Sequence, residues 1–123
     1  MLIPQLSGNS RLGYPLHMQT RLKDRWVLIT GASSGFGAAA AKSFGAAGAK
    51  LLLGARRVEK LEQVATEARK AGSPEVHVHG LDVSRTISVE QFLTWAGERI
   101  RNPKAEFRHL QILVNNAGGA HGL

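Results

Sequence analysis

One stretch, residues 26–47, constrains the fold more than any other part of the sequence. It opens with the short apolar run Val27-Leu28-Ile29 and closes with alanine-rich sequence from Ala38 that favours a helix. An apolar β-branched run of this kind predicts a strand buried on both faces of a parallel sheet. Gly48 follows at a position suited to a left-handed helix cap. The predicted order is strand, glycine-rich turn and helix.

The glycines of the turn have distinct predicted roles. Gly31 permits a sharp exit from the strand, Gly35 lets backbone approach a pyrophosphate, and Gly37 lets the helix pack closely on the sheet. The first amides of the helix form an anion site, to which Ser33 and Ser34 can add hydroxyl donors. The spacing is Gly-x-x-x-Gly-x-Gly, and the alternative interpretation is an ordinary strand-to-helix turn. A dinucleotide phosphate is the predicted ligand.

A second strand, residues 50–53 and ended by Gly54, and a second helix, residues 58–71, are predicted next, with Gly72 capping the helix. In NAD-binding units an acidic residue about twenty positions after the glycines bonds the ribose 2′-hydroxyl. Here Arg56 and Arg57 lie near that position. A guanidinium can hold a 2′-phosphate that a carboxylate would repel. The pair predicts NADP rather than NAD; the alternative is two solvated arginines at a helix start.

Residues 76–83 are predicted to form the third strand and its exit. His77 and His79 alternate with valines, so both are expected on one face, partly exposed. The sequence identifies no further ligands for a metal beside them. Ser88 is predicted to cap a third helix, with Trp95 packed under it. The expected buried face of that helix contains Val89, Phe92, Leu93, Ala96 and Ile100.

A fourth strand, residues 110–114, runs into Asn115-Asn116-Ala117-Gly118. This segment, Asp82-Val83 and the run Thr30-Gly31-Ala32-Ser33-Ser34-Gly35-Phe36-Gly37 together resemble the motifs of the classical short-chain dehydrogenase/reductase family. Phe36 stands where Ile or Leu is commoner in that family. The resemblance covers about residues 20–123. With Arg56-Arg57, the combination looks most like the NADP-dependent serine and 3-hydroxy acid dehydrogenase branch.

The resemblance implies a fold and a set of cofactor contacts. The fold would be an α/β Rossmann-like, doubly wound parallel sheet of strand order 3-2-1-4, truncated after the fourth strand. Asp82 would accept a hydrogen bond from the adenine amino group beside Val83; an alternative role for this carboxylate is a helix or turn cap. The cofactor-binding set is completed by Phe36 in the turn and by Asn115, Ala117 and Gly118 on the adenosine ribose side.

The family's catalytic serine and its Tyr-x-x-x-Lys pair are absent from this sequence, whose single tyrosine is Tyr14. We therefore expect the cofactor-binding N-terminal fragment of an NADP-dependent oxidoreductase, with no catalytic residue of its own. The full-length protein would move hydride between nicotinamide and a small-molecule alcohol or ketone, and a homo-oligomer is possible only for that form. The alternative is a short chain that is complete as a non-catalytic nucleotide- or partner-binding module.

Composition agrees with one domain. Of 123 residues, 43% are hydrophobic and 20% are charged, as in soluble globular proteins. Residues 1–24 are expected to form a flexible arm, with Met18 as the hypothetical true start, and residues 25–123 a partial NADP-binding Rossmann domain. The net charge of +7 is spread along the chain without an aromatic-interleaved stripe, so no nucleic-acid partner is predicted. No membrane-spanning window is recognisable, and a cytoplasmic location is expected.

Overall fold

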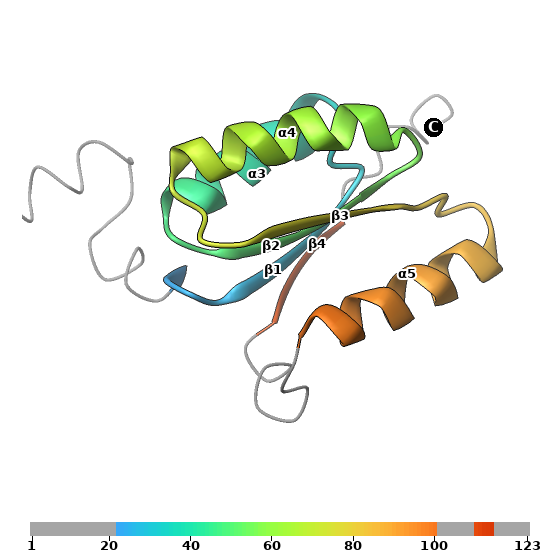
Figure 1. The fold of residues 1–123 in the computed structure, drawn as a ribbon. Helices are drawn as coiled ribbons and strands as arrows, with labels where there is room; N and C mark the ends of the chain where they lie inside the picture. Colours follow the sequence, from blue (N-terminus) through green and yellow to red (C-terminus); the bar gives the residue numbers. More distant parts are fainter. Residues whose placement is uncertain (1–21, 101–109, 115–123) are drawn as a thin grey trace, which may run out of the picture.

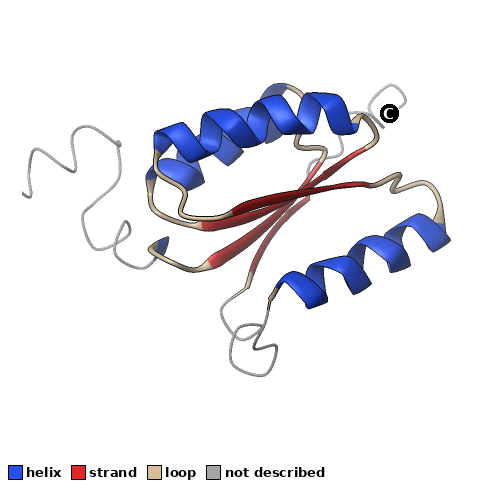
Figure 2. Ribbon diagram, in the orientation of Figure 1, coloured by secondary structure: helices blue, strands red, loops and turns tan. Residues whose placement is uncertain are grey.

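The computed structural model describes residues 22–100 and 110–114. The predicted arm, apart from its last residues, and Asn115, Ala117 and Gly118 lie outside this range. The elements in chain order are β1 (Trp26–Thr30), α3 (Gly35–Ala46), β2 (Lys50–Ala55), α4 (Val58–Ala71), β3 (Val76–Gly80), α5 (Thr86–Arg99) and β4 (Gln111–Val114). Helices α3 and α4 cover one face of the sheet and α5 lies on the other (Figures 1 and 2).

The four strands form one parallel sheet of order β3-β2-β1-β4, which confirms the predicted doubly wound fold. β1 is buried along its whole length, and β2 is buried after Lys50. Short apolar runs without polar alternation predict this burial on both faces. Because all strands are parallel, their carboxyl ends lie at the same edge of the sheet, where ligands of such folds bind.

Two apolar clusters join the layers. Successive side chains of β1 point to opposite faces, so Val27 and Ile29 pack toward α3 and α4, whereas Trp26 and Leu28 pack toward α5. The larger cluster, on the α3 and α4 side, contains thirteen buried residues, and the cluster on the α5 side contains seven. Among the described residues, more apolar side chains are therefore buried on the two-helix face of the sheet.

The second helix has its predicted bounds. Its predicted apolar face, Leu61, Val64, Ala65 and Ala68, is buried. Gly72 is its C-terminal cap residue. Among the helices of the described residues, none has both the length and the apolar character needed to cross a membrane.

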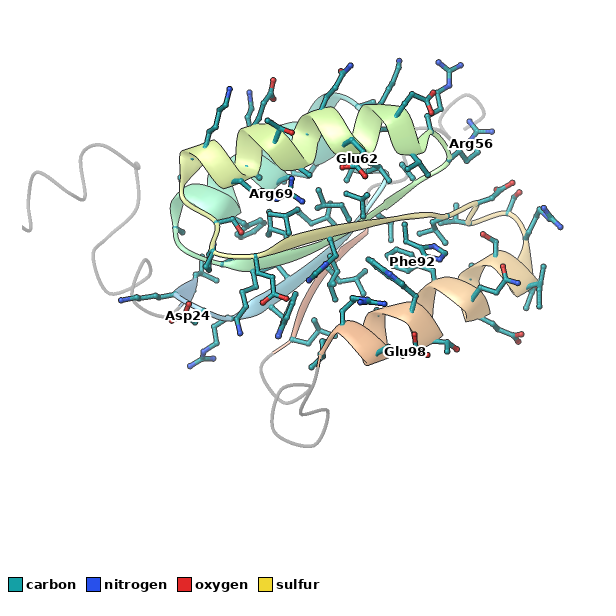
Figure 3. All side chains as sticks on the ribbon, in the orientation of Figure 1. Asp24, Arg56, Glu62, Arg69, Phe92 and Glu98 are labelled. Atoms are coloured by element: carbon teal, nitrogen blue, oxygen red, sulfur yellow. The ribbon has the colours of Figure 1, made fainter. Side chains whose placement is uncertain are left out.

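The second strand is longer than predicted. Gly54 does not end it, because Gly54 still pairs with Thr30 on one side and His79 on the other. A Cβ atom at Gly54 would lie 2.6 Å from Cε1 and 2.8 Å from Cζ of Phe92. Figure 3 shows Phe92 between α5 and the sheet. The glycine makes room for this ring rather than ending the strand.

The third helix begins earlier than predicted, at Thr86, so Ser88 is not its cap. Leu93 was expected in the core but is 53% exposed. The buried face is centred on Phe92 and Ala96, and each helical residue turns about 100° from the one before it. Leu93 is thereby directed away from the sheet, while Trp95 packs against the core cluster as expected.

Candidate cofactor site

The loops that follow β1, β2 and β3 meet at the carboxyl edge of the sheet. Backbone hydrogen bonds continue beyond the strands: Ala32 N–H donates to Gly54 O at 3.1 Å, and Leu81 N–H donates to Ala55 O at 2.9 Å. Figure 3 shows Arg56 at this end of the molecule and Asp24 at the other. The predicted phosphate turn, the arginine pair and the Asp82 loop are therefore neighbours in space.

The turn after β1 depends on two glycines in the left-handed region, Gly31 at φ 63° and Gly35 at φ 45°. Other residues adopt such angles at a cost of about 1–2 kcal/mol. A Cβ atom at Gly35 would meet no described atom within 4 Å, so the space beside this backbone is open. Gly37 is buried, in line with close packing on the sheet. Both observations fit the predicted approach of a ligand to the turn.

The N-terminus of α3 is positively polarised and carries no internal counter-charge. Its cap residue, Ser34, has extended backbone but makes no side-chain capping bond, and the first turn contains no acidic residue. Ser34 is exposed, Ser33 is half-buried, and Phe36 is 65% exposed. Helix N-termini of this kind bind anions through their free amides and dipole. The geometry can accept a phosphate.

Arg56 and Arg57 directly follow β2 and are both exposed. Arg57 is the N-terminal cap residue of α4, with extended backbone. Within the described part of the chain, neither guanidinium forms a salt bridge. Both cationic groups are consequently available to an anionic ligand at the carboxyl edge.

Asp82 lies two residues after β3, and its carboxylate is already engaged on one oxygen. Oδ1 accepts hydrogen bonds from the Ser84 hydroxyl at 2.7 Å and from the Ser84 amide at 3.0 Å. These two bonds, and more weakly the charges of Arg56 and Arg85, hold the pKa of Asp82 below its ordinary value, against an opposing effect of burial that is weaker than either bond. The carboxylate is ionised at neutral pH. The alternative role as a turn cap is confirmed, and Val83 beside it is 53% exposed.

The structure gives Ser88 a different role from the one that the sequence predicts. Ser88, predicted as a helix cap, lies inside α5, and its Oγ accepts a hydrogen bond from the Asp82 backbone amide at 2.9 Å. The signal for this contact is the spacing Asp82-x-Ser84-x-x-x-Ser88 across a strand exit and a helix start. The spacing alone does not say which serine faces the loop.

The two strand histidines share one face, as predicted, and both are half-buried. His77 stacks on Trp26 and lies 2.6 Å from a Glu75 carboxylate oxygen. His79 packs 4.9 Å from the Trp95 ring. Over residues 22–100 and 110–114, no three His, Cys, Asp or Glu residues are placed to hold a metal ion.

Comparison with known proteins identifies the origin of these motifs. The family model described as "short chain dehydrogenase" matches residues 25–122. The chain is 42% identical over 92 residues to 11-beta-hydroxysteroid dehydrogenase A of Sesamum indicum, covering 75% of this chain and 24% of the relative. The chain thus spans about a quarter of that relative's length.

Solved structures agree. An alcohol dehydrogenase from the archaeon Thermococcus sibiricus, complexed with 5-hydroxy-NADP, superposes with a TM-score of 0.59 at 44% identity, over 63% of this chain and 33% of the other. An NADH-dependent reductase, A1-R′, complexed with NAD, superposes with a TM-score of 0.61 at 25% identity, over 67% and 34%. Fold, motif order and matched range coincide. The chain therefore belongs to the short-chain dehydrogenase family.

Proposed function

We propose that residues 25–123 form the NADP-binding part of a short-chain oxidoreductase. The observation that carries this proposal is Arg56. It is exposed, follows β2 directly, and stands at the carboxyl edge where NAD-binding units carry an acidic residue. The similar solved structures were obtained with NADP-type and NAD-type cofactors, so family membership alone does not decide between them.

The described residues fit such a cofactor at three points. The uncapped N-terminus of α3 suits the pyrophosphate, and the open space beside Gly35 suits close approach of the backbone. Arg56 and Arg57 suit a 2′-phosphate, because a guanidinium can donate two charge-assisted hydrogen bonds to it. Asn115, Ala117 and Gly118 are proposed to line the adenosine ribose side, as in the family.

Bound NADPH would supply hydride to a carbonyl carbon, and NADP would accept it from a carbinol. The described residues of this chain bind and orient the dinucleotide. The chain spans about a third of its solved relatives, so the reaction is proposed for the whole protein. Its substrate would be a small-molecule alcohol or ketone, with a 3-hydroxy acid as the specific candidate from the motif combination.

The test compares NADPH and NADH affinities, measured by fluorescence titration, for the unmodified chain and for Arg56→Ala. If Arg56 grips the 2′-phosphate, its removal should reduce the preference for NADPH by on the order of 1.5–3 kcal/mol. NADH affinity should change little, because NADH lacks that phosphate.

Lys70→Ala is the matched control. It removes one positive charge from an exposed residue in the last turn of α4, whereas Arg56 precedes the first turn. This variant should keep the preference for NADPH. Equal affinity of the unmodified chain for both dinucleotides would contradict the proposed cofactor.

A further inference from the structure

A hollow of about 440 Å³ runs along α5 and is lined by side chains of that helix and by His79 of β3. Its volume lies in the range of small-molecule sites. Among the described residues that are proposed to contact the cofactor, none lines it. We infer that this hollow binds a linear polyamine, through two carboxylates and the aromatic wall beside them.

The lining of the hollow carries negative charge in a chain that is positive overall. Glu90 and Glu98 are exposed carboxylates of the lining, and none of the described residues that line the hollow is lysine or arginine. As far as the structure describes the chain, neither carboxylate forms a salt bridge. The whole sequence has a net charge of +7, so the molecule as a whole repels a polycation. Binding of a polycation must therefore come from a local site.

One wall of the hollow is aromatic. The Trp95 ring lies 4.9 Å from the His79 ring and 5.2 Å from the Phe92 ring, centre to centre, and Trp95 is half-buried. Aromatic faces attract organic cations, and tryptophan attracts them most strongly. His79 Nδ1 lies 2.7 Å from the Gly80 carbonyl oxygen and donates to it, so Nε2 of the neutral imidazole is an acceptor. This wall offers a π surface and an acceptor to an ammonium group.

Oxygen acceptors recur along α5 at every fourth residue. Glu90, Thr94 and Glu98 all line the hollow, and their spacing places them along one side of the helix. The rise of the helix separates the first from the last by about 12 Å along its axis. Extended spermidine has terminal ammonium groups a similar distance apart and a secondary amine between them. Its methylene segments can lie against Trp95 and the exposed side chain of Ile87.

A metal ion fits this lining less well than an organic cation. Among the residues that the structure describes, no three His, Cys, Asp or Glu side chains are grouped to hold a metal. Metal–oxygen bonds are about 2–2.6 Å long, so carboxylates two helical turns apart do not share one ion. The hollow therefore suits a long cation rather than a compact one.

Isothermal titration calorimetry with spermidine, at fixed ionic strength, tests this inference. The unmodified chain should bind spermidine with a stoichiometry of one to one. Glu90→Gln and Glu98→Gln should each weaken binding about threefold, and the double variant about tenfold, as expected for exposed ion pairs. Trp95→Leu should also weaken binding about threefold, because the cation–π attraction is lost.

Two comparisons make the result specific. Glu62→Gln removes the same charge from an exposed position of α4, outside the hollow, and should leave the affinity unchanged. Octamethylenediamine and putrescine carry the same charge, but only the longer diamine spans both carboxylates. The unmodified chain should prefer octamethylenediamine, and the double variant Glu90→Gln with Glu98→Gln should lose most of this preference.

The outcomes decide the inference independently of the cofactor. Absence of spermidine binding would overturn it. Equal losses of affinity in Glu62→Gln and Glu98→Gln would also overturn it, because they would reveal a diffuse attraction to negative charge. Glu90 and Glu98 are exposed, so their variants keep the test decisive even if Trp95→Leu loses stability. Dinucleotide affinity should stay unchanged in every variant, so failure of either proposal leaves the other standing.

Discussion

Gly54 shows how one missing side chain shapes the α5 side of the sheet. The Phe92 ring occupies the space in which a Cβ atom of residue 54 would lie, and the Leu81 side chain comes within 3.0 Å of the same point. Because Phe92 is only 1% exposed, its ring has little room to move away. A methyl group at position 54 would overpack this region.

We therefore predict that Gly54→Ala lowers the free energy of unfolding by about 1–3 kcal/mol. Urea denaturation followed by circular dichroism measures this change. Gly80→Ala is the matched control, since its Cβ would meet only a Val58 methyl at 3.6 Å among the described atoms. Equal stability of the two variants would show that the Phe92 ring relaxes without cost.

Single residues also differ in how far the sequence predicts them. The glycines of the first turn and Arg56 could be predicted from the sequence. Each has a chemical role at a defined position relative to a strand, the turn after it and the helix that follows. The contact between Asp82 and Ser88 was not predicted, because it depends on where α5 begins and how it lies on the sheet. Helix starts are poorly specified when no side chain caps them.

Among the elements, β3 occupies one end of the described sheet. It bonds β2 through odd-numbered residues: Glu75 O accepts from Leu51 N–H at 2.8 Å, and Leu81 N–H donates to Ala55 O at 2.9 Å. The even-numbered residues of β3 consequently turn their backbone groups to the sheet edge. Such groups are a template on which another strand can pair.

Two outward carbonyls of β3 are occupied by side chains. Arg69 Nη2 of α4 donates to Val76 O at 2.8 Å. His79 Nδ1 lies 2.7 Å from Gly80 O, and because a carbonyl only accepts, this nitrogen must carry the proton. The edge is thus partly closed to strand addition.

Arg69→Ala should expose the Val76 carbonyl and increase self-association relative to the unmodified chain, because it frees part of the edge. Sedimentation velocity over a range of protein concentrations measures the change. Lys70→Ala removes a neighbouring exposed charge without touching β3 and should behave like the unmodified chain. Identical sedimentation of both variants at every concentration would contradict a protective role for Arg69.

The elements themselves were predictable to different degrees. Helix α4 has a clear apolar period and ends at a glycine, so its bounds were correct. β2 was predicted too short because Gly54 was interpreted as a stop, and only the tertiary contact with Phe92 explains a glycine inside that strand. Local pattern determines an element's type better than its ends.

At the scale of the whole molecule, the two faces of the sheet are covered unequally. Helices α4 and α5 each contain 14 residues, but α4 buries four of them and α5 buries two. Local opening requires less free energy where fewer apolar contacts are lost. We predict that backbone amides of α5 exchange with deuterium faster than those of α4.

Native-state hydrogen exchange followed by mass spectrometry measures this difference, and the equal lengths of the two helices make α4 an internal control. Faster exchange in α4 than in α5 would contradict the argument from burial. The sheet order, and the edge of the sheet at which the glycine turn and the arginine pair meet, were predictable because motif order along the chain determines them. The difference in the number of buried residues between α4 and α5 was not predictable, because it depends on how many side chains each helix packs against the sheet.

The strand order also has a consequence for how the chain reaches its fold. Trp26 pairs with Lys50, 24 positions later, and Leu51 pairs with Val76, 25 positions later. Val27 pairs with Gln111, 84 positions later. Closing that longer loop costs about 1 kcal/mol more in chain entropy. During synthesis, the segment from β1 to β3 can therefore assemble first and present β1 as a pairing partner, so that β4 joins last among the four described strands.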